Sequence, residues 1–338
     1  KPRGRARVGK QGGRKISVFR HQSVLSVARE AAYWVARLWF RGVFYNSSLR
    51  GRRPQSLRLI PEENWPGSSD KGAGLVDGRF RFLNHSLPAA NAFSSALEAG
   101  PGWQAELHGF DWLRDMRAVG TEAARVQART CVLEWIDGNA KWRLLSWRPD
   151  ILSSRLCNWL THAAFISAGA DENFAATFLE NTARQVKHLR RAARFMPNGL
   201  ERMLSAKALI YASLCLPGGI QYVPRLLKSI AKMCDRQILQ DGGHIERSPK
   251  AQLIALRHLI DIRSVLLASN VEVPEALQRA IDRAAPMLRF YRHGDGGLAL
   301  FNGSNEGEAW LIDVVLTKAE SRGKPLTSAP NTGFERFT

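Results

Sequence analysis

The stretch DENFAATFLENTARQVKHLRRAARFMPNGLERMLSAKALIYASLC, residues 171–215, decides the class of fold. Its apolar side chains recur at the three- and four-residue intervals of an amphipathic helix, first over 171–193 and again over 200–215. Between them lies FMPNG (195–199), whose proline and glycine interrupt a helix. Two long helices joined by so short a link run antiparallel, so the stretch predicts a helical hairpin.

The same pattern continues on both sides of this hairpin. Its links are short and carry Gly or Pro, and Pro149, Pro249 and Pro274 stand where helices begin, a position that tolerates proline. Such hairpins form a bundle, a solenoid or a closed toroid, and no repeat of fixed period is evident. The fold class is mainly α, with helices predicted over residues 103–117, 120–137, 149–168, 171–193, 200–215, 222–238, 248–269 and 273–291.

The segments outside the helical hairpins have other patterns. A helix is predicted over 23–45, a Pro-containing linker over 46–74 and a short hairpin over 75–84, while DGGLALFNGS (295–304) and TGFERFT (332–338) predict strands. We therefore expect four parts: a disordered basic arm (1–22), a leading segment with the helix, linker and hairpin (23–102), the helical domain (103–294) and a C-terminal β-segment (295–338).

Positive charge is concentrated at the N-terminal end of the chain. Residues 1–58 hold 15 Lys and Arg but a single acid, Glu30, so they carry most of the net charge of +19. A basic segment of this kind either attracts polyanions or is a solvated arm without a specific partner. The helix predicted over 23–45 is apolar around much of its circumference and is interrupted by arginines. It suits an anionic membrane surface or, as the commoner alternative, packing against a core.

The cysteines indicate neither disulfides nor a metal site. Cys131, Cys157, Cys215 and Cys234 lie in apolar helical contexts and form no CxxC pair, so they are predicted to be buried free thiols. No metal ligands and no cofactor are predicted. No apolar run reaches the roughly 18 residues of a membrane span, and no signal peptide is visible.

Three stretches carry a resemblance to a known family. SWRPDILSSRLCNWLTH (146–162), QILQDGGHIERSP (237–249) and DGGLALFNGS (295–304) resemble the helical part of heparinase II/III-like proteins. LRGRRPQSLRLIPEENWPG (49–67) and GRFRFLN (78–84) are similar to the N-terminal segment of the alphaproteobacterial branch. The turn DGGH-x-ER-SP is specific in combination, although each part of it alone is a weak signal.

The resemblance implies both a fold and a chemistry. The implied fold is an incomplete (α/α) toroid followed by an antiparallel β-sandwich, of which this chain holds only the start. The implied activity is a polysaccharide lyase that cleaves a uronic-acid glycan by β-elimination, in the bacterial periplasm or cell envelope. That reaction needs a group that neutralises the uronate carboxylate, together with a base and an acid held at hydrogen-bond distance.

The chain departs from the pattern that the resemblance implies for active members. Such members open one helix with an Asn-His pair, where this chain has Leu200 and Glu201. They also follow the Ser-Pro with a Tyr-His pair, where this chain has Ala251 and Gln252. The primary hypothesis is a lyase for an acidic polysaccharide, and the alternative is a catalytically inactive, glycan-binding member of the same fold. No specific nucleic-acid partner is expected, because no sequence-reading motif is present.

Two groups of residues are candidates for the site. In the turn, His244 would be a substitute base, Arg247 would bind the glycan carboxylate and Glu246 would assist binding; alternatively, Glu246 and Arg247 pair and His244 bonds a neighbouring backbone group. On the helix after SWRPD, Arg155, Asn158 and Trp159 share a face through their i, i+3 and i+4 spacing. They suit carboxylate pairing, hydrogen bonding and sugar stacking. Equally, they suit a core in which the arginine bonds a nearby loop.

Overall fold

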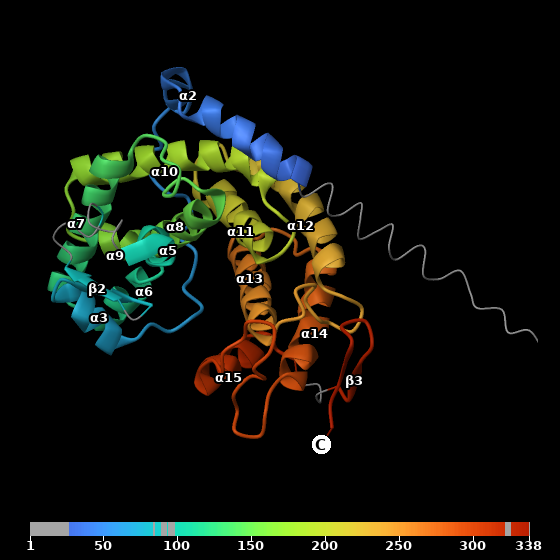
Figure 1. Cartoon of the computed structure of the whole chain (residues 1–338). Coiled ribbons are helices and arrows are strands. Elements are labelled where there is room, and N and C mark those ends of the chain that lie inside the picture. Colours follow the sequence, from blue (N-terminus) through green and yellow to red (C-terminus); the bar gives the residue numbers. More distant parts are fainter. Residues whose placement is uncertain (1–26, 84, 89–92, 94–98, 322–325, 338) are drawn as a thin grey trace, which may run out of the picture.

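Antiparallel helix pairs follow one another around a curve, as Figure 1 shows. The computed structural model describes residues 27–83, 85–88, 93, 99–321 and 326–337. The incomplete (α/α) toroid is confirmed. Residues 27–40 are helical, and the named helices are α2 (Val43–Ser48), α3 (Ser69–Val76), α5 (Gly100–Gly109), α6 (Leu113–Val119), α7 (Glu122–Asn139), α8 (Pro149–Thr161), α9 (Ala163–Ser167), α10 (Glu172–Ala192), α11 (Leu200–Cys215), α12 (Val223–Gln237), α13 (Pro249–Ala268), α14 (Glu275–Phe290) and α15 (Ala309–Lys318).

Local capping chemistry fixes where the long helices start. The side chains of Thr121, Asp171 and Ser248 accept hydrogen bonds from backbone N–H groups in the first turns of α7, α10 and α13. Each satisfies a donor that the helix itself leaves unpaired. Pro149 and Pro249 open α8 and α13, as their place in the sequence predicts.

Two of the predicted helices are interrupted. The one predicted over 103–117 ends as α5 at Phe110, whose backbone is left-handed (φ 60°), and resumes as α6. The one predicted over 149–168 divides at His162 into α8 and α9. Three residues, 110–112, separate α5 from α6, and His162 alone separates α8 from α9; the apolar periodicity on either side gives no sign of these breaks.

The strands are short and lie at the two ends of the described chain. β1 (Arg79–Phe82) and β2 (His85–Pro88) pair antiparallel, with Phe80 opposite Leu87, which places the predicted hairpin a few residues later than 75–84. The predicted linker contains α3. Near the C-terminus, β3 (Ser328–Ala329) pairs antiparallel with β4 (Phe334–Glu335).

The prediction of a strand over residues 295–304 is wrong. This stretch forms turns and a loop, with one isolated bridge between Arg292 and Leu298, and α15 follows it. Gly296, Asn302 and Gly303 have positive φ angles, which a continuous strand does not accommodate. The arm predicted over 1–22 lies outside the described residues, and the four-part division of the chain stays a prediction.

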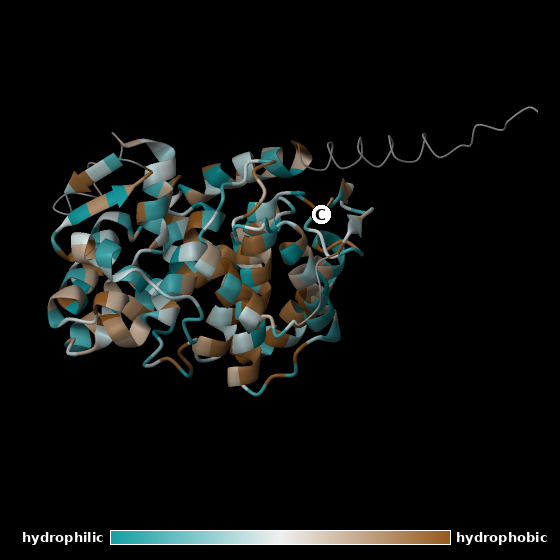
Figure 2. Ribbon diagram, turned by 90° about the horizontal axis from the view of Figure 1, so that it is seen from below, coloured by the Kyte–Doolittle hydropathy of each residue, from teal (hydrophilic) through white to brown (hydrophobic). Residues whose placement is uncertain are grey.

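Two apolar clusters fill the curve of helices. One joins α8, α11, α12, α13, α14 and α15, and the other joins α5, α6, α7, α8 and α10 around Trp103, Trp135 and Trp159. Figure 2 shows brown, apolar ribbon concentrated on the helices in the middle of the molecule. All four cysteines are free and buried, as predicted. Burial raises the pKa of the Cys131 and Cys157 thiols to about 12, which keeps them inert.

The close packing of α3 on α6 gives a test of the fold. A methyl group at Gly72 would lie 2.2 Å from the Asp115 carbonyl oxygen and 2.6 Å from a Val119 methyl carbon. Gly72→Ala should therefore force α3 away from α6 and lower the free energy of unfolding by about 1–3 kcal/mol. Urea denaturation measures this difference.

Gly74 of the same helix is the matched control, because no atom lies within 4 Å of a methyl group placed there. Gly74→Ala should be neutral or stabilising by up to about 1 kcal/mol, since alanine favours helix. Equal effects of the two substitutions would contradict the packing described.

Candidate functional site

A cavity of about 250 Å³ lies on the inner side of the curve, and we call it the central cleft. Three long helices each turn one face towards it. α13 contributes Ile254, Arg257, His258 and Asp261, whose spacing of three, one and three residues marks a single helical face. α8 contributes Asn158 and its neighbours one turn away, and α11 contributes Lys207 and Tyr211. The segment Glu62–Trp65 and the start of α6 complete the lining.

A buried carboxylate organises this cleft. Asp261 accepts hydrogen bonds from Asn64 Nδ2 at 2.9 Å, Trp65 Nε1 at 3.1 Å and Lys207 Nζ at 2.7 Å. Burial raises the pKa of the Asp261 carboxyl, but the Lys207 charge together with the hydrogen bonds from Lys207, Asn64 and Trp65 outweighs burial, and the net pKa lies below its usual value. Burial likewise lowers the pKa of Lys207, and the charge of Asp261, its hydrogen bond and the other acidic groups nearby together reverse this, so that the net pKa is raised. Both groups are therefore charged at neutral pH.

Two further carboxylates of the cleft, Asp111 and Glu63, have partners, whereas the exposed Glu62 has none among the described residues. Asp111 forms an ion pair with Arg114. Glu63 Oε1 accepts from the Trp65 backbone N–H at 3.0 Å, and its other oxygen lies 3.2 Å from His162 Nε2. Burial raises the pKa of Glu63, and His162, the Arg114 charge and the Trp65 backbone N–H together turn this into a net lowering. The negative charges inside the cleft are thus largely balanced.

Arg257 and His258 differ from these residues. Arg257 stacks over the Trp65 ring, with its Cζ 5.0 Å from the ring centroid. Among the described residues, neither Arg257 Nε nor His258 Nδ1 has a hydrogen-bond partner, although both atoms are buried. Burial, followed by the Lys207 charge, lowers the pKa of His258 to about 3, so its imidazole is neutral at pH 7. The cleft therefore offers a guanidinium and a neutral imidazole with unused hydrogen-bonding capacity.

The turn that contains His244 is braced as a structural element. His244 is 1% exposed, its Nε2 lies 3.1 Å from Gln237 Oε1 and its Nδ1 accepts from the Glu246 N–H at 3.4 Å. Burial lowers the pKa of His244 to about 4. The imidazole is enclosed and both its nitrogens are engaged, an environment that does not favour the substitute-base role predicted from the sequence.

Gln252 holds this turn in place. Its Nε2 donates to the carbonyls of Gly242 and Ala284, each at 2.9 Å, and its Oε1 accepts from the His244 N–H at 2.7 Å. The side chain is fully buried. The position where the resemblance implies a catalytic His thus carries an amide that ties the turn to α14.

Glu246 and Arg247 are exposed at the edge of the turn. Glu246 Oε1 accepts from the Leu200 N–H at 3.0 Å and so caps the start of α11. Arg247 has a left-handed backbone (φ 54°), and its carbonyl accepts from Asn302 Nδ2 at 2.7 Å. The two side chains form no ion pair with each other among the described residues, and neither lines the central cleft.

The predicted face of Arg155, Asn158 and Trp159 is divided between core and cleft. Arg155 is fully buried and donates to Gln185 Oε1 and to the carbonyls of His108 and Ser146, all at 2.8 Å. Trp159 is fully buried in the second apolar cluster. Asn158 alone lines the cleft, where its Nδ2 donates to the Gly109 carbonyl at 2.9 Å.

Sequence reasoning missed Lys207, Arg257, His258 and Asp261. A signal for the three residues of α13 exists in IALRHLIDIRSVLL (254–267), where charged and polar groups at 257, 258 and 261 interrupt a largely apolar helix on one face. The pairing of Asp261 with Lys207 and with the segment Glu62–Trp65 crosses long sequence separations and carries no such signal.

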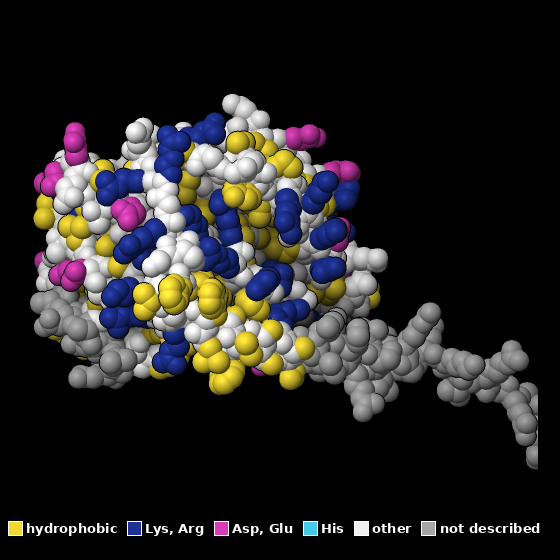
Figure 3. All heavy atoms as spheres, turned by 90° about the horizontal axis from the view of Figure 1, so that it is seen from above, with side chains coloured by type: hydrophobic (Ala, Val, Ile, Leu, Met, Phe, Trp, Pro, Cys, Tyr) yellow, Lys and Arg dark blue, Asp and Glu magenta, His cyan; other side chains and the backbone are white. Residues whose placement is uncertain are grey.

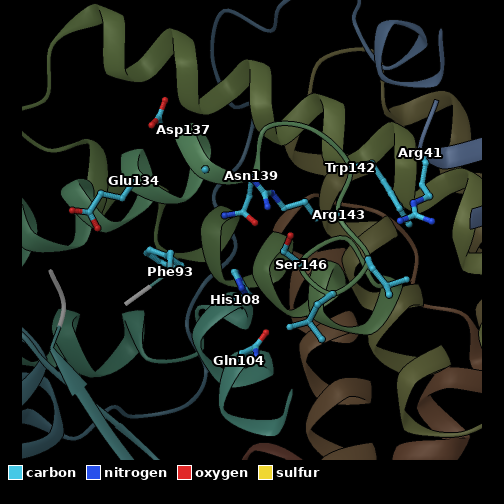
Figure 4. A pocket seen from close by; sticks show the side chains of 13 residues that line it. Arg41, Phe93, Gln104, His108, Glu134, Asp137, Asn139, Trp142, Arg143 and Ser146 are labelled. Carbon is cyan, nitrogen blue, oxygen red and sulfur yellow. The ribbon is translucent and has the colours of Figure 1, made fainter. Parts of the chain in front are cut away.

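A larger cavity of about 930 Å³ is lined mainly by α5, α7 and residues 142–146, and Figure 4 shows it. Asn139, Arg143 and Ser146 gather in its middle, whereas Glu134 and Asp137 lie apart from them. Its histidine, His108, accepts from Trp135 Nε1 at 2.9 Å, and burial lowers its pKa to about 3. Phe93, whose neighbours in the chain lie outside the described residues, borders this cavity. The central cleft is therefore the better defined site.

The arrangement of helical hairpins around a charged inner cleft defines an incomplete (α/α) toroid domain. Residues 92–316 match the family model Heparinase II/III N-terminus, and the chain belongs to this family. It is 30% identical over 314 residues to FtsZ-localized protein C of Caulobacter vibrioides, covering 92% of this chain and 54% of that protein.

Solved structures show the same fold. A crystal structure of heparinase III matches with a TM-score of 0.64 at 17% identity, covering 93% of this chain and 51% of that one. A mutant of the heparan sulfate lyase HepC from Pedobacter heparinus matches with a TM-score of 0.56 at 15% identity, covering 76% and 46%. The chain thus spans about half the length of these relatives. Among the described residues, no cluster of His, Cys, Asp and Glu could hold a metal ion.

The buried pair of Asp261 and Lys207 leads to a prediction about pH. In the wild type, the lowered pKa of Asp261 stabilises the fold above pH ~4 and this contribution is lost as the pH falls through the folded-state pKa. Lys207→Met removes the compensating charge, so burial is then opposed mainly by the hydrogen bonds from Asn64 and Trp65, and the Asp261 pKa rises. The variant should lose about 3–5 kcal/mol of unfolding free energy at pH 7 and less near pH 4.

Denaturant unfolding at the two pH values measures this effect. The control is Lys207→Met combined with Asp261→Asn, which should recover much of the stability at pH 7 because no unpaired charge remains buried. A loss that is equal at both pH values would show that Asp261 is not the group responsible.

Proposed function

We propose that this chain is a glycan-binding domain that holds an acidic sugar in the central cleft and does not itself carry out β-elimination. The observation that supports this most is the Arg257 guanidinium, which has a buried Nε without a partner among the described residues, while Asp111 and Asp261 have partners of their own. A uronate carboxylate would supply the missing acceptor. The neutral His258 beside it would bond a sugar hydroxyl.

The size of the cleft supports recognition of one sugar rather than of a long chain. Its volume of about 250 Å³ lies below the roughly 300–1,000 Å³ of pockets that enclose drug-sized ligands. A glycan would therefore enter with one residue or an end, while the rest lies outside.

The absence of lyase chemistry is proposed from the residues of the turn. Leu200, Glu201, Ala251 and Gln252 stand where the resemblance implies Asn-His and Tyr-His, and Gln252 is committed to holding the turn. His244 is enclosed with a pKa of about 4, so it is poorly placed to exchange protons with a ligand. The lyase hypothesis would then require groups beyond this chain, since the heparinase structures are about twice as long.

The proposal is tested with a heparan sulfate hexasaccharide and the whole chain. Arg257→Gln should weaken binding by about 10- to 100-fold, because a charge-assisted hydrogen bond is lost. Titration calorimetry measures the affinity. The matched control is Arg117→Gln, which removes an exposed charge of α6 outside the cleft and should leave affinity unchanged.

Two results would overturn this proposal. One is an affinity that Arg257→Gln does not alter. The other is the release of unsaturated uronate ends, seen as ultraviolet absorbance, by the wild-type chain, because that product forms only by elimination.

A second role is favoured by the relative named FtsZ-localized protein C, to which 92% of this chain aligns. We propose that this chain also localises with FtsZ. A fluorescent fusion of the whole chain should coincide with labelled FtsZ in dividing bacterial cells, and Arg257→Gln should not change its position. A uniform distribution beside a normal FtsZ pattern would contradict shared localisation while leaving glycan binding open.

The basic N-terminal segment is proposed to bind polyanions, whether acidic glycan or anionic lipid. Its 15 basic residues against one acid support this, and such binding would weaken with salt because exposed charges are screened over ~10 Å at 0.1 M ionic strength.

A further inference from the structure

The helix over residues 27–40 presents an apolar stripe to solvent. Val27, Trp34, Val35 and Leu38 recur on one side of it and are 55–66% exposed. Just beyond, Val43 and Phe44 in and next to the first turn of α2 are 80% and 83% exposed. A group of large apolar side chains of this kind, outside any core, marks a site of contact with something else.

The opposite side of the same helix is fixed to the toroid. Phe40 is buried with Tyr45 in a small cluster under α10, and the Tyr45 hydroxyl lies 2.6 Å from His188 Nδ1. Tyr33 packs on Phe195, with ring centroids 5.6 Å apart, and Arg29 Nη1 donates to the Met196 carbonyl at 3.4 Å. The apolar stripe therefore faces outward because the other side of the helix is already engaged.

Cationic side chains of the toroid surround this stripe. The second half of α10 with the following turn, residues 181–195, holds five basic residues and no acid. α12 holds four basic residues and one acid, Asp235. They are half-buried or exposed, and none forms an ion pair with another described residue: Arg184, Lys187, Arg190, Arg191, Arg194, Arg225, Lys228, Lys232 and Arg236.

The helix and the cationic face form one continuous surface. Arg202 of α11 has a pKa lowered by burial and then by the charges of Arg29 and Arg236, so cations from the N-terminal helix and α12 meet there. Figure 3 looks onto this side and shows Lys and Arg spread across it, acids mainly at its margin, and an apolar group next to the grey trace of the N-terminal residues. We call it the apolar-cationic face.

We propose that the apolar-cationic face docks the folded toroid onto an anionic lipid bilayer. An outward apolar stripe flanked by Arg and Lys matches the boundary between acyl chains and acidic headgroups, where apolar side chains enter and cations remain at headgroup level. Nucleic acid would engage the cations but gives no reason to expose Trp34 and Phe44. This inference goes beyond glycan binding and does not depend on it.

Docking on this face would also orient the molecule. In Figure 1 the N-terminal helix and α10 lie at the top, α12 runs down the right side from the end of that helix, and the helices that line the central cleft lie beneath α10. The cleft would then be held away from the bilayer surface, free to meet a ligand. No helix among the described residues is long and apolar enough to cross a membrane, so contact would be along the surface.

The test uses the whole chain and vesicles of equal parts phosphatidylglycerol and phosphatidylcholine, with pure phosphatidylcholine vesicles for comparison. Two variants probe the two components: Arg225→Gln, Lys228→Gln and Lys232→Gln together, and Trp34→Ser with Phe44→Ser. All five side chains are exposed, and the basic arm is the same in every variant. Co-sedimentation should show a fall in affinity of about tenfold or more for each variant.

Matched controls remove the same kinds of side chain elsewhere. Arg79→Gln, Arg81→Gln and Arg117→Gln remove three exposed cations from β1 and α6, and Leu267→Ser with Trp310→Ser removes exposed apolar groups. Both should bind as the wild type does, and circular dichroism should be unchanged throughout. Binding to anionic vesicles that survives the α12 substitutions would overturn docking by the toroid. Tighter binding to duplex DNA, indifferent to Trp34→Ser with Phe44→Ser, would identify a nucleic-acid surface instead.

Discussion

The architecture of the cleft depends on one buried carboxylate. Asp261 of α13 accepts hydrogen bonds from Asn64, Trp65 and Lys207, so a single group ties the segment before α3 and the inner face of α11 to α13. A carboxylate in this position is stable only because a cation and two neutral donors compensate the loss of water. Its removal would leave Lys207 buried without a counter-charge and Trp65 without its partner, and the wall that supports Arg257 would be lost.

A second constraint explains why the turn over 240–252 can retain the family pattern without its chemistry. The double glycine, His244 and the Ser-Pro are required to shape the connection between α12 and α13. Gly242 has φ 86°, and a methyl group there would lie 1.9 Å from the Arg283 carbonyl oxygen. Ser248 caps α13. Gln252 then satisfies backbone groups that would otherwise be buried without partners. The motif is therefore explained by its role in folding, whereas the proposed ligand contacts come from Arg257 and His258, further along α13.

The molecule separates its charges in space. Inside the cleft, Asp261 with Lys207 and Asp111 with Arg114 neutralise one another, which leaves a small, nearly balanced interior. On the outer side, the cations of α10 and α12 have no such counter-charges among the described residues, and like charges there lower the pKa of Lys187 after burial does. This accumulation opposes folding through self-repulsion, and an anionic surface would relieve it. The proposed bilayer contact and the proposed glycan site thus use opposite sides of one toroid.

The sequence alone determined the helical class, the order of the hairpins and the burial of the cysteines, because these follow from apolar periodicity and from the Gly and Pro residues that end helices. It also determined the family, through the combined turn DGGH-x-ER-SP. It did not determine the break at Phe110 or the loop over 295–304. Nor did it determine the cationic face, since the cations of α10 and α12 lie far apart in the chain and become one surface with the N-terminal helix only in the folded toroid. Arg155 shows the limit most clearly: spacing placed it on a face with Asn158, but only tertiary contacts with Gln185, His108 and Ser146 decided that it braces the core rather than meeting a ligand. Hydrogen-bond partners distant in the chain leave no periodic trace in a sequence, and the choice between a buried brace and an open site rests on them.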